Sequence, residues 1–393
     1  ILPSWSPDGR WIAYTSRTQE SRSSIWLVPA DGGDPRQLTD LRGNDWGGTW
    51  SADGRLLYFS SDRGGSMNLW RIPMDPDRGT ARAGPQPIPT PSPFAAHPSV
   101  SRDGSRVLYT SAITTQNIER AALDPDVDTL LEPFRLTTGS RQWSSPDPTT
   151  DGSRIAFYSR DLPEGDLYVV RGDGTGLRQL TGDSAIDRVP RWSPDGSRVA
   201  YFSNRSGPLQ TWIVEADGSD NRQITQSDVV STPGAWSPDG RRVVINTPPE
   251  AGHILDLTEP PGERARQPLV YDSAWGPFVA NDWSPDGTRL AGMHGFADQG
   301  VGYYELATGE HVALTDFGQW PVWMPDGRTI LFVAGGKAFY TVDAETGDID
   351  TVHTAVRDVL GPPRITADGR HLFYSRRVTE GDIWMVTLGG GSD

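Results

Sequence analysis

The chain has 393 residues, with 44 Gly, 33 Pro and no Cys, and its 51 acidic and 36 basic residues give a formal net charge of −15. Without Cys there are no disulfides, thiolate metal sites or cysteine nucleophiles. The negative charge and the lack of a basic stripe argue against a nucleic-acid partner. The sequence also contains no run of about 18 apolar residues, so it predicts no membrane span.

A repeat of 40 to 50 residues organises the chain. An Asp-Gly step recurs nine times, and in six of the nine copies a Trp stands three residues before the Asp. The fullest copy reads Trp192-Ser193-Pro194-Asp195-Gly196-Ser197-Arg198. The nine steps begin at Asp8, Asp53, Asp103, Asp151, Asp195, Asp239, Asp286, Asp326 and Asp368. A period of this length is typical of repeat folds, in which each copy forms one supersecondary unit.

In chain order, each copy predicts four short strands. The first strand ends at the Trp, and the Pro-Asp-Gly turn after it supplies the preset φ and the positive-φ position of a tight turn. The second strand alternates apolar residues, a polar loop leads to the third, and a second Asp-Gly turn precedes a short fourth strand. The second, third and fourth strands are clearest at residues 11–14, 25–28, 36–39, 68–72, 178–181, 198–203, 211–214, 222–225 and 382–386.

This pattern predicts the blades of a β-propeller, because stacking four-stranded sheets in a ring buries their faces. We therefore expect an all-β chain with one domain over residues 1–393, a single closed propeller of nine four-stranded blades, with eight blades as the alternative. The ninth copy has only three strands. Its fourth strand is expected from the N-terminus, where only about four residues precede Trp5.

The pattern W-S-P-D-G-x-x-I-A-[YF]-x-S, followed by I-W-[LV]-V, Asp-Gly and Q-L-T, resembles the TolB-type, WD-like propeller repeat over essentially the whole chain. The copies at Asp103, Asp151 and Asp368 keep the Asp-Gly step but lack the Trp. The resemblance implies a bacterial, extracytoplasmic protein, periplasmic or secreted, with protein or peptide partners. Segments 69–73 and 381–386 are most similar to propellers that follow kinase or winged-helix domains in bacterial membrane receptors. Whether such segments precede Ile1 is left open by the sequence.

No motif in the sequence points to catalysis. The chain has no G-x-S-x-G, H-E-x-x-H, Walker or dinucleotide-binding string. His253 and His294 fall near second-to-third strand loops of consecutive copies, where imidazoles could bind a metal or transfer protons, but isolated loop histidines are usually plain surface residues. The Asp-rich segment 124–128 lacks the central Gly and terminal Glu of a calcium loop. We expect no catalytic residue and no cofactor, with a metal in the central channel left open.

Residues that depart from the repeat need an explanation other than blade building. Four Trp lie between a fourth strand and the next first strand, in loops that a propeller gathers around one mouth of its channel. Exposed aromatic and Arg side chains are typical of binding surfaces. The predicted ligand-binding residues are Trp46, His97, Arg141, Trp143, Arg188, Trp275, Phe278 and Trp320. The alternative is that these Trp pack on the outer edges of neighbouring blades.

The sequence thus favours a non-catalytic propeller that binds a protein, a peptide or a small ligand such as a carbohydrate at its loop-rich mouth. The sensor domain of a larger signalling receptor is the alternative, and a lyase or hydrolase acting in the channel ranks below both. The identity of the ligand and the oligomeric state stay open.

Overall fold

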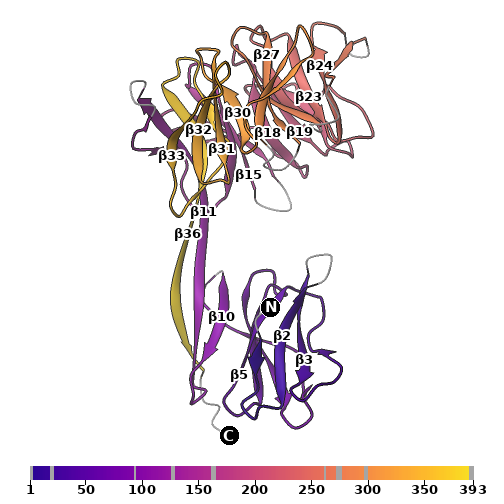
Figure 1. The fold of residues 1–393 in the computed structure, drawn as a ribbon, viewed down its shortest axis with the longest axis vertical. Coiled ribbons are helices and arrows are strands. Elements are labelled where there is room, and N and C mark those ends of the chain that lie inside the picture. The colour runs from indigo at the N-terminus through magenta and orange to yellow at the C-terminus, as the bar shows by residue number, and fades with distance from the viewer. Residues whose placement is uncertain are drawn as a thin grey trace. The chain divides into compact units, whose positions relative to one another are not determined.

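The computed structural model describes residues 3–17, 22–92, 94–124, 129–160, 165–260, 263–270, 277–295 and 300–388. The described secondary structure is all β, as the repeats predict, and it forms antiparallel sheets (Figure 1). The chain divides into two compact units. Unit 1 comprises Ile1–Thr114 and Thr379–Asp393, and unit 2 comprises Thr115–Val378. Each unit is described by itself.

Unit 1 contains three sheets that pack face to face in chain order. The first sheet consists of β1 (Ser4–Trp5), β2 (Trp11–Arg17), β3 (Ser23–Pro29) and β4 (Arg36–Gln37). The second consists of β5 (Asp45–Trp50), β6 (Leu56–Ser61), β7 (Asn68–Asp75), β8 (Thr80–Ala81) and β9 (Gln86–Ile88). The third combines β10 (Ala95–Val100) with the first half of β11 (Arg106–Asp124) and the second half of β36 (His371–Thr387).

Unit 2 contains six sheets, five of which are four-stranded meanders that follow the predicted strand order. The first sheet consists of β14 (Trp143–Pro148), β15 (Arg154–Ser159), β16 (Leu167–Arg171) and β17 (Arg178–Gln179), and the second of β18 (Asp187–Trp192), β19 (Arg198–Ser203), β20 (Gln210–Glu215) and β21 (Arg222–Gln223). The third consists of β22 (Thr232–Trp236), β23 (Arg242–Thr247), β24 (Glu250–Asp256) and β25 (Arg266–Pro268), and the fourth of β26 (Phe278–Trp283), β27 (Arg289–His294), β28 (Val301–Glu305) and β29 (His311–Ala313). The fifth consists of β30 (Gln319–Trp323), β31 (Thr329–Ala334), β32 (Ala338–Asp343) and β33 (Ile349–Thr354).

The sixth sheet of unit 2 joins the end of the chain to its middle. The first half of β36 pairs with β34 (Val359–Leu360) and β35 (Arg364–Ile365), and the second half of β11 pairs with β12 (Thr129–Leu130) and β13 (Phe134–Arg135). Strands β11 and β36 lie side by side (Figure 1). They run antiparallel, because the Leu123 N–H donates to the Arg370 carbonyl (2.9 Å) and the Leu388 N–H donates to that of Ser105 (2.8 Å).

The six sheets of unit 2 contact one another in a closed cycle. Each neighbouring pair shares a buried apolar cluster, and the sixth sheet packs on both the fifth and the first. Phe373 of β36, for example, packs with Trp143 and Ile155 of the first sheet, while Leu372 packs with Leu331 of the fifth. The first strands therefore surround a central channel, as in a propeller.

The predicted number of blades, nine or eight, is not confirmed, because six sheets already close a cycle within unit 2. The expectation that an N-terminal strand completes the ninth copy is wrong for the described residues. There β36 takes β11 as its neighbour, and β1 pairs with β2. The repeat specifies blades, whereas ring size depends on which distant strands pair. The prediction that residues 1–393 form one domain stays a prediction.

The recurrent turn residues hold each blade's first two strands together. In the copy at Asp195, the Ser193 hydroxyl donates to the Asp195 carboxylate (2.5 Å) and accepts the Arg198 N–H (3.0 Å). Gly196 has φ +67°, a conformation that side chains disfavour. These contacts satisfy backbone groups of the turn locally.

The recurrent Arg and Trp residues link consecutive blades. The Arg198 guanidinium lies over the Trp236 ring of the next sheet, 4.9 Å from the ring centroid. The same stack joins Arg154 to Trp192 (4.8 Å) and Arg289 to Trp323 (4.6 Å). Five of the six Trp that precede the turns are buried, whereas Trp5 is 59% exposed.

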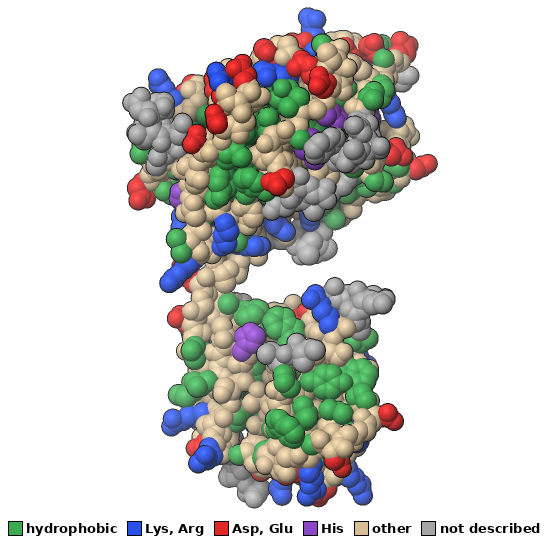
Figure 2. Space-filling view, viewed as in Figure 1, with side chains coloured by type: hydrophobic (Ala, Val, Ile, Leu, Met, Phe, Trp, Pro, Cys, Tyr) green, Lys and Arg blue, Asp and Glu red, His purple; other side chains and the backbone are tan. Residues whose placement is uncertain are grey.

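Acidic and basic side chains are interspersed over the face of unit 2 that Figure 2 shows. This distribution agrees with the lack of a basic stripe in the sequence.

We expect Ser193→Ala to lower the free energy of unfolding by about 1–3 kcal/mol, because it leaves a buried turn without its hydrogen-bonding hydroxyl. Urea unfolding measures the loss. The matched control is Ser197→Ala, which removes an exposed hydroxyl that also donates to Asp195 and should cost less than about 0.5 kcal/mol. Equal losses in the two variants would contradict this account of the turn.

Candidate functional site

The first strands that surround the channel of unit 2 are bulged at one shared position. Strands β14, β18, β22, β26 and β30 all shift register against their second strands, for example between Ser144 and Asp147. Three bulges hold a non-glycine residue with positive φ: Ser145 (49°), Val189 (54°) and Trp320 (51°). A left-handed Val is strained, so surrounding contacts must hold it there. Bulges re-aim the side chains that follow them, here at the channel wall.

Four charged residues occupy one position of the repeat, four residues before the turn Asp. They are Asp147, Arg191, Asp282 and Arg364, which we call the channel quartet. Ala235 stands at the same position in the third sheet. The next residue in each strand is the Trp of the repeat or the residue that replaces it. Because side chains alternate along a strand, each quartet residue points to the opposite face of the sheet from that neighbour.

Ion pairs and main-chain bonds hold the quartet across the sheets. The Arg364 Nε donates to Asp147 Oδ1 (3.1 Å), and Arg191 Nη1 lies 3.8 Å from the same oxygen. Arg364 Nη2 donates to the Asn281 carbonyl (3.3 Å), and Arg191 Nε donates to that of Gly234 (3.0 Å). Arg364 therefore ties the sixth sheet to the first and the fourth.

The two carboxylates each bind the next sheet as well. Asp147 Oδ2 accepts the Trp192 N–H and Asp282 Oδ2 accepts the Trp323 N–H, both at 2.7 Å. Burial raises the pKa of Asp282 to about 6, even though Arg364 favours its ionised form. Burial and the like charge of Arg364 lower the pKa of Arg191 to about 9.

The quartet lies in a cavity of about 380 Å³ at the end of the channel that carries the Asp-Gly turns, which we call the turn-end cavity. Its other lining residues are mainly Pro, Trp and small residues, including Pro148, Pro194 and Trp236. The two arginines share Asp147 and also interact electrostatically with Asp282, so the four charges largely compensate one another, and their contacts join the sheets.

A second cavity, of about 370 Å³, lies at the opposite end of the channel among the loops, and we call it the loop-end cavity. It forms where the innermost strand of the sixth sheet is interrupted between β34 and β35 by the segment 361–363. This segment contains two prolines, which lack the N–H that a strand needs. Its lining includes Tyr158, Arg160, Trp320 and Arg377, and no Asp or Glu.

The loop-end cavity carries positive charge that is not neutralised within it. Arg160 and Arg377 are exposed, and neither forms an ion pair in the part of the chain that the structure describes. The Arg188 guanidinium lies 5.7 Å from the centroid of the Tyr158 ring, which lines the cavity. The arrangement can take an aromatic or apolar group that carries negative charge.

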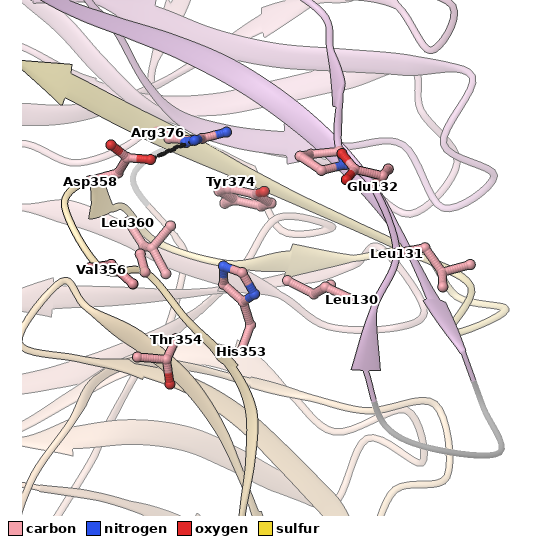
Figure 3. Close-up of a pocket in the computed structure, with 12 residues that line it drawn as sticks. Leu130, Leu131, Glu132, His353, Thr354, Val356, Asp358, Leu360, Tyr374 and Arg376 are labelled. Carbon is pink, nitrogen blue, oxygen red and sulfur yellow. Dashed lines mark hydrogen bonds and ion pairs between the residues drawn. The ribbon is translucent and has the colours of Figure 1, made fainter. Parts of the chain in front are cut away.

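A third cavity lies at the outer edge of unit 2, between β33 and the sixth sheet (Figure 3). Its charged groups already pair with one another. Arg376 binds Asp358 (2.5 Å) and lies 3.4 Å from Glu119, which also accepts the Tyr374 hydroxyl (3.2 Å). His353 faces this cavity, and burial lowers its pKa. This internal pairing makes it a weaker binding candidate than the loop-end cavity.

The structure places two of the predicted ligand-binding residues together in unit 1. The rings of Trp46 and His97 lie with centroids 6.1 Å apart, on the bulged first strands β5 and β10. His97 is exposed and has φ +55°. A binding role for this pair stays a prediction.

Of the predicted residues that the structure describes, five lie in unit 2, and two of these are buried. Trp143 is 3% exposed and packs on Phe157 and Tyr168, while Phe278 is 2% exposed. These two side chains are therefore core residues of unit 2, and Trp143 packs on its own sheet rather than on the outer edge of a neighbouring one. Arg141 lies over Trp143 (5.4 Å).

Trp320 lines the loop-end cavity together with Tyr158, and the Arg188 guanidinium lies over the Tyr158 ring without lining the cavity itself. Trp275 lies outside the described residues. His253 and His294, considered above as a pair, belong to different buried environments, in β24 and at the end of β27.

Sequence reasoning missed the channel quartet, although the signal was present. Aligning the repeats on the Asp-Gly step places two Asp and two Arg at one position that is Ala or Val in two other copies. Charged residues at a position next to the core Trp are unexpected for a buried strand, and this contrast could have identified the channel wall.

Within the described residues, no three His, Asp or Glu side chains come together as a metal site requires. That part of the chain also has no helix that is long and apolar enough to cross a membrane.

The chain is similar to proteins of one repeat family. Residues 1–136 and 83–255 match the TolB β-propeller domain family. An uncharacterized protein of Agrobacterium fabrum is 29% identical over 162 residues, which are 39% of this chain and 52% of that protein. A putative tricorn protease homolog 2 of Streptomyces coelicolor is 36% identical over 211 residues, which are 47% of this chain and 16% of that protein.

The crystal structure of TolB from Acinetobacter baumannii aligns with a TM-score of 0.47 at 13% identity, and the alignment covers 80% of this chain and 79% of that one. The chain spans about half of the Agrobacterium protein and a smaller share of the Streptomyces one. These matches do not bear on the kinase or winged-helix context, which stays a prediction.

We expect Asp282→Asn to stabilise the protein progressively as the pH rises from 4 to 6, and by a constant amount above pH 7. The native pKa of about 6 exceeds the ordinary value of 3.8, so ionising the native carboxyl costs up to about 3 kcal/mol. Melting temperatures of variant and parent across pH 4–8 measure the difference.

Asp195→Asn provides a control of opposite sign. Its hydrogen bond from Ser193 lowers the pKa of Asp195, so the ionised form stabilises the fold above about pH 4 and the variant should lose stability there. A pH-independent difference for Asp282→Asn would contradict the assignment of Asp282 to a buried channel site.

Proposed function

Because the chain belongs to the TolB β-propeller family, we propose that it is a non-catalytic binding module that takes a protein segment, a peptide or a small ligand at the loop-end cavity of unit 2. The observation that carries this proposal is the half-buried Trp320 on a bulged first strand, facing a cavity lined by Tyr158, Arg160 and Arg377. Aromatic and Arg side chains supply most of the affinity at binding sites, since they bury large areas with little loss of entropy.

The position of the cavity supports the same proposal. It lies at the ends of strands, which hold Trp320 and Tyr158 in place, and beside the connections that contain Arg160 and Gly335, which can vary without disturbing the blades. Trp320 is fixed by its own packing on the cluster of the fifth and sixth sheets, so a ligand would meet a preorganised ring. An extracytoplasmic location, periplasmic or secreted, is part of the proposal and rests on the family resemblance alone.

The turn-end cavity is a weaker candidate for ligand binding. Arg191 and Arg364 are engaged with Asp147 and with main-chain carbonyls, so a ligand there would have to compete with bonds that join the sheets. Breaking a buried ion pair costs several kcal/mol.

We expect Trp320→Ala to weaken binding of the protein's ligands at least tenfold, as is usual for an aromatic anchor. Labelled protein is first screened on a peptide array and a glycan array, and calorimetry then gives the affinity of each ligand found. Trp320→Phe keeps a ring at this position and should retain most of the affinity. The matched control is Trp384→Ala, which removes an exposed Trp of unit 1 that does not line the cavity.

Two outcomes would overturn the proposal. One is that neither array yields a ligand with saturable binding. The other is that Trp320→Ala binds every ligand found as tightly as Trp384→Ala does.

A further inference from the structure

A cavity of about 390 Å³ lies on the outer strands of unit 2, apart from the channel. It is bounded by the end of β21 and the residues after it, by β24, and by β25 with the residues before it. We call it the outer cavity. Its lining consists of Gln223, Ile224, Thr225, Gln226, His253, Leu255, Arg264 and Arg266.

The outer cavity has two guanidinium groups and no carboxylate in its lining, in a chain whose formal charge is −15. In the described part of the chain, neither Arg264 nor Arg266 forms an ion pair. Burial and the nearby charge of Arg222 lower the pKa of Arg264. The cations of this region therefore repel one another, although Arg222 is itself ion-paired with Asp220.

Glu259, which is outside the lining of the cavity, places a carboxylate beside this segment. The Glu259 carboxylate accepts the N–H of Ala265 (2.7 Å), and Arg264 Nε donates to the main-chain carbonyl of Glu259 (3.1 Å). This carbonyl fixes one edge of the Arg264 guanidinium and leaves its terminal nitrogens available as donors.

His253 adds a buried polar group to the same cavity. It is 9% exposed, and its Nε2 has no hydrogen-bond partner. Burial and the charge of Arg266 lower its pKa to about 4, so the ring is neutral at physiological pH. An anion near Arg266 would remove this repulsion and favour the imidazolium.

We propose that the outer cavity binds an oxyanion of the phosphate type, held by Arg264 and Arg266 beside His253. Guanidinium groups present paired N–H donors that match the oxygens of such a group, and charge-assisted bonds of this kind are strong. The amides of Gln223 and Gln226 line the same space and supply further polar groups. The site lies on outer strands, so its occupation is independent of ligand binding in the channel.

The test uses the full chain with inorganic phosphate and, separately, glycerol 3-phosphate, with acetate as the monovalent control. Calorimetry measures affinity, and NMR follows the His253 resonance, assigned with His253→Gln. We expect saturable binding of at least one phosphate, a rise in the His253 pKa on saturation, and little effect of acetate. Tighter binding of the ester than of the free ion would identify a phosphorylated molecule as the ligand, and the reverse would identify free phosphate.

The double variant Arg264→Gln/Arg266→Gln should lose at least tenfold in phosphate affinity, whereas the exposed control Arg370→Gln should bind as the parent does. Equal melting temperatures of the two variants without phosphate exclude a folding defect, and any shift of the parent's melting temperature by phosphate should vanish in the double variant. The proposal is overturned if no phosphate binding saturates, or if the double variant binds as tightly as Arg370→Gln.

Discussion

The closure of six sheets in unit 2 is the constraint on which the rest of the structure depends, and the ion pair between Arg364 and Asp147 spans the point of closure. Each sheet alone would expose two apolar faces, and only its two neighbours in the ring cover them. The sixth sheet is built from distant parts of the chain, β36 and β11, so the ring closes only when these strands meet. The shape of both ends of the channel therefore depends on the pairing of β36 with β11.

Residues that follow the repeat build the blades, and residues that depart from it provide the chemistry. The Ser-Asp turn and the Arg-Trp stack recur from sheet to sheet and join strands or neighbouring sheets. The departures are the channel quartet, the interrupted strand at 361–363 and the arginines of the outer cavity. The turn end of the channel is neutralised by mutual ion pairs, whereas the loop end keeps uncompensated arginines beside Trp320. This difference is why the proposed binding site lies at the loop end.

Local structure could be predicted from the sequence because the repeat offered many copies of each signal. The turn at Asp195 and the strands on either side of it form as expected, and five of the six Trp that precede the turns are buried, Trp5 being the exception. The partner of β36 could not be predicted, because pairing with β11 depends on contacts between residues far apart in the chain. The sequence predicts Trp143 and Trp320 in the same class of loop, whereas both lie on first strands, one buried and the other lining a cavity. Only the three-dimensional packing of their neighbours separates them.

A double-mutant cycle between Asp147 and Arg364 tests the ring closure most directly, since these residues are 217 positions apart in sequence. Unfolding free energies of Asp147→Asn, Arg364→Gln and the double variant give the coupling between the two side chains. Closure of the six sheets predicts a coupling of about 1–3 kcal/mol, because Asp147→Asn leaves Arg364 without its carboxylate and Arg364→Gln leaves Asp147 with only the more distant Arg191. Additive effects, within about 0.5 kcal/mol, would show that the two side chains do not meet and would contradict the closed ring.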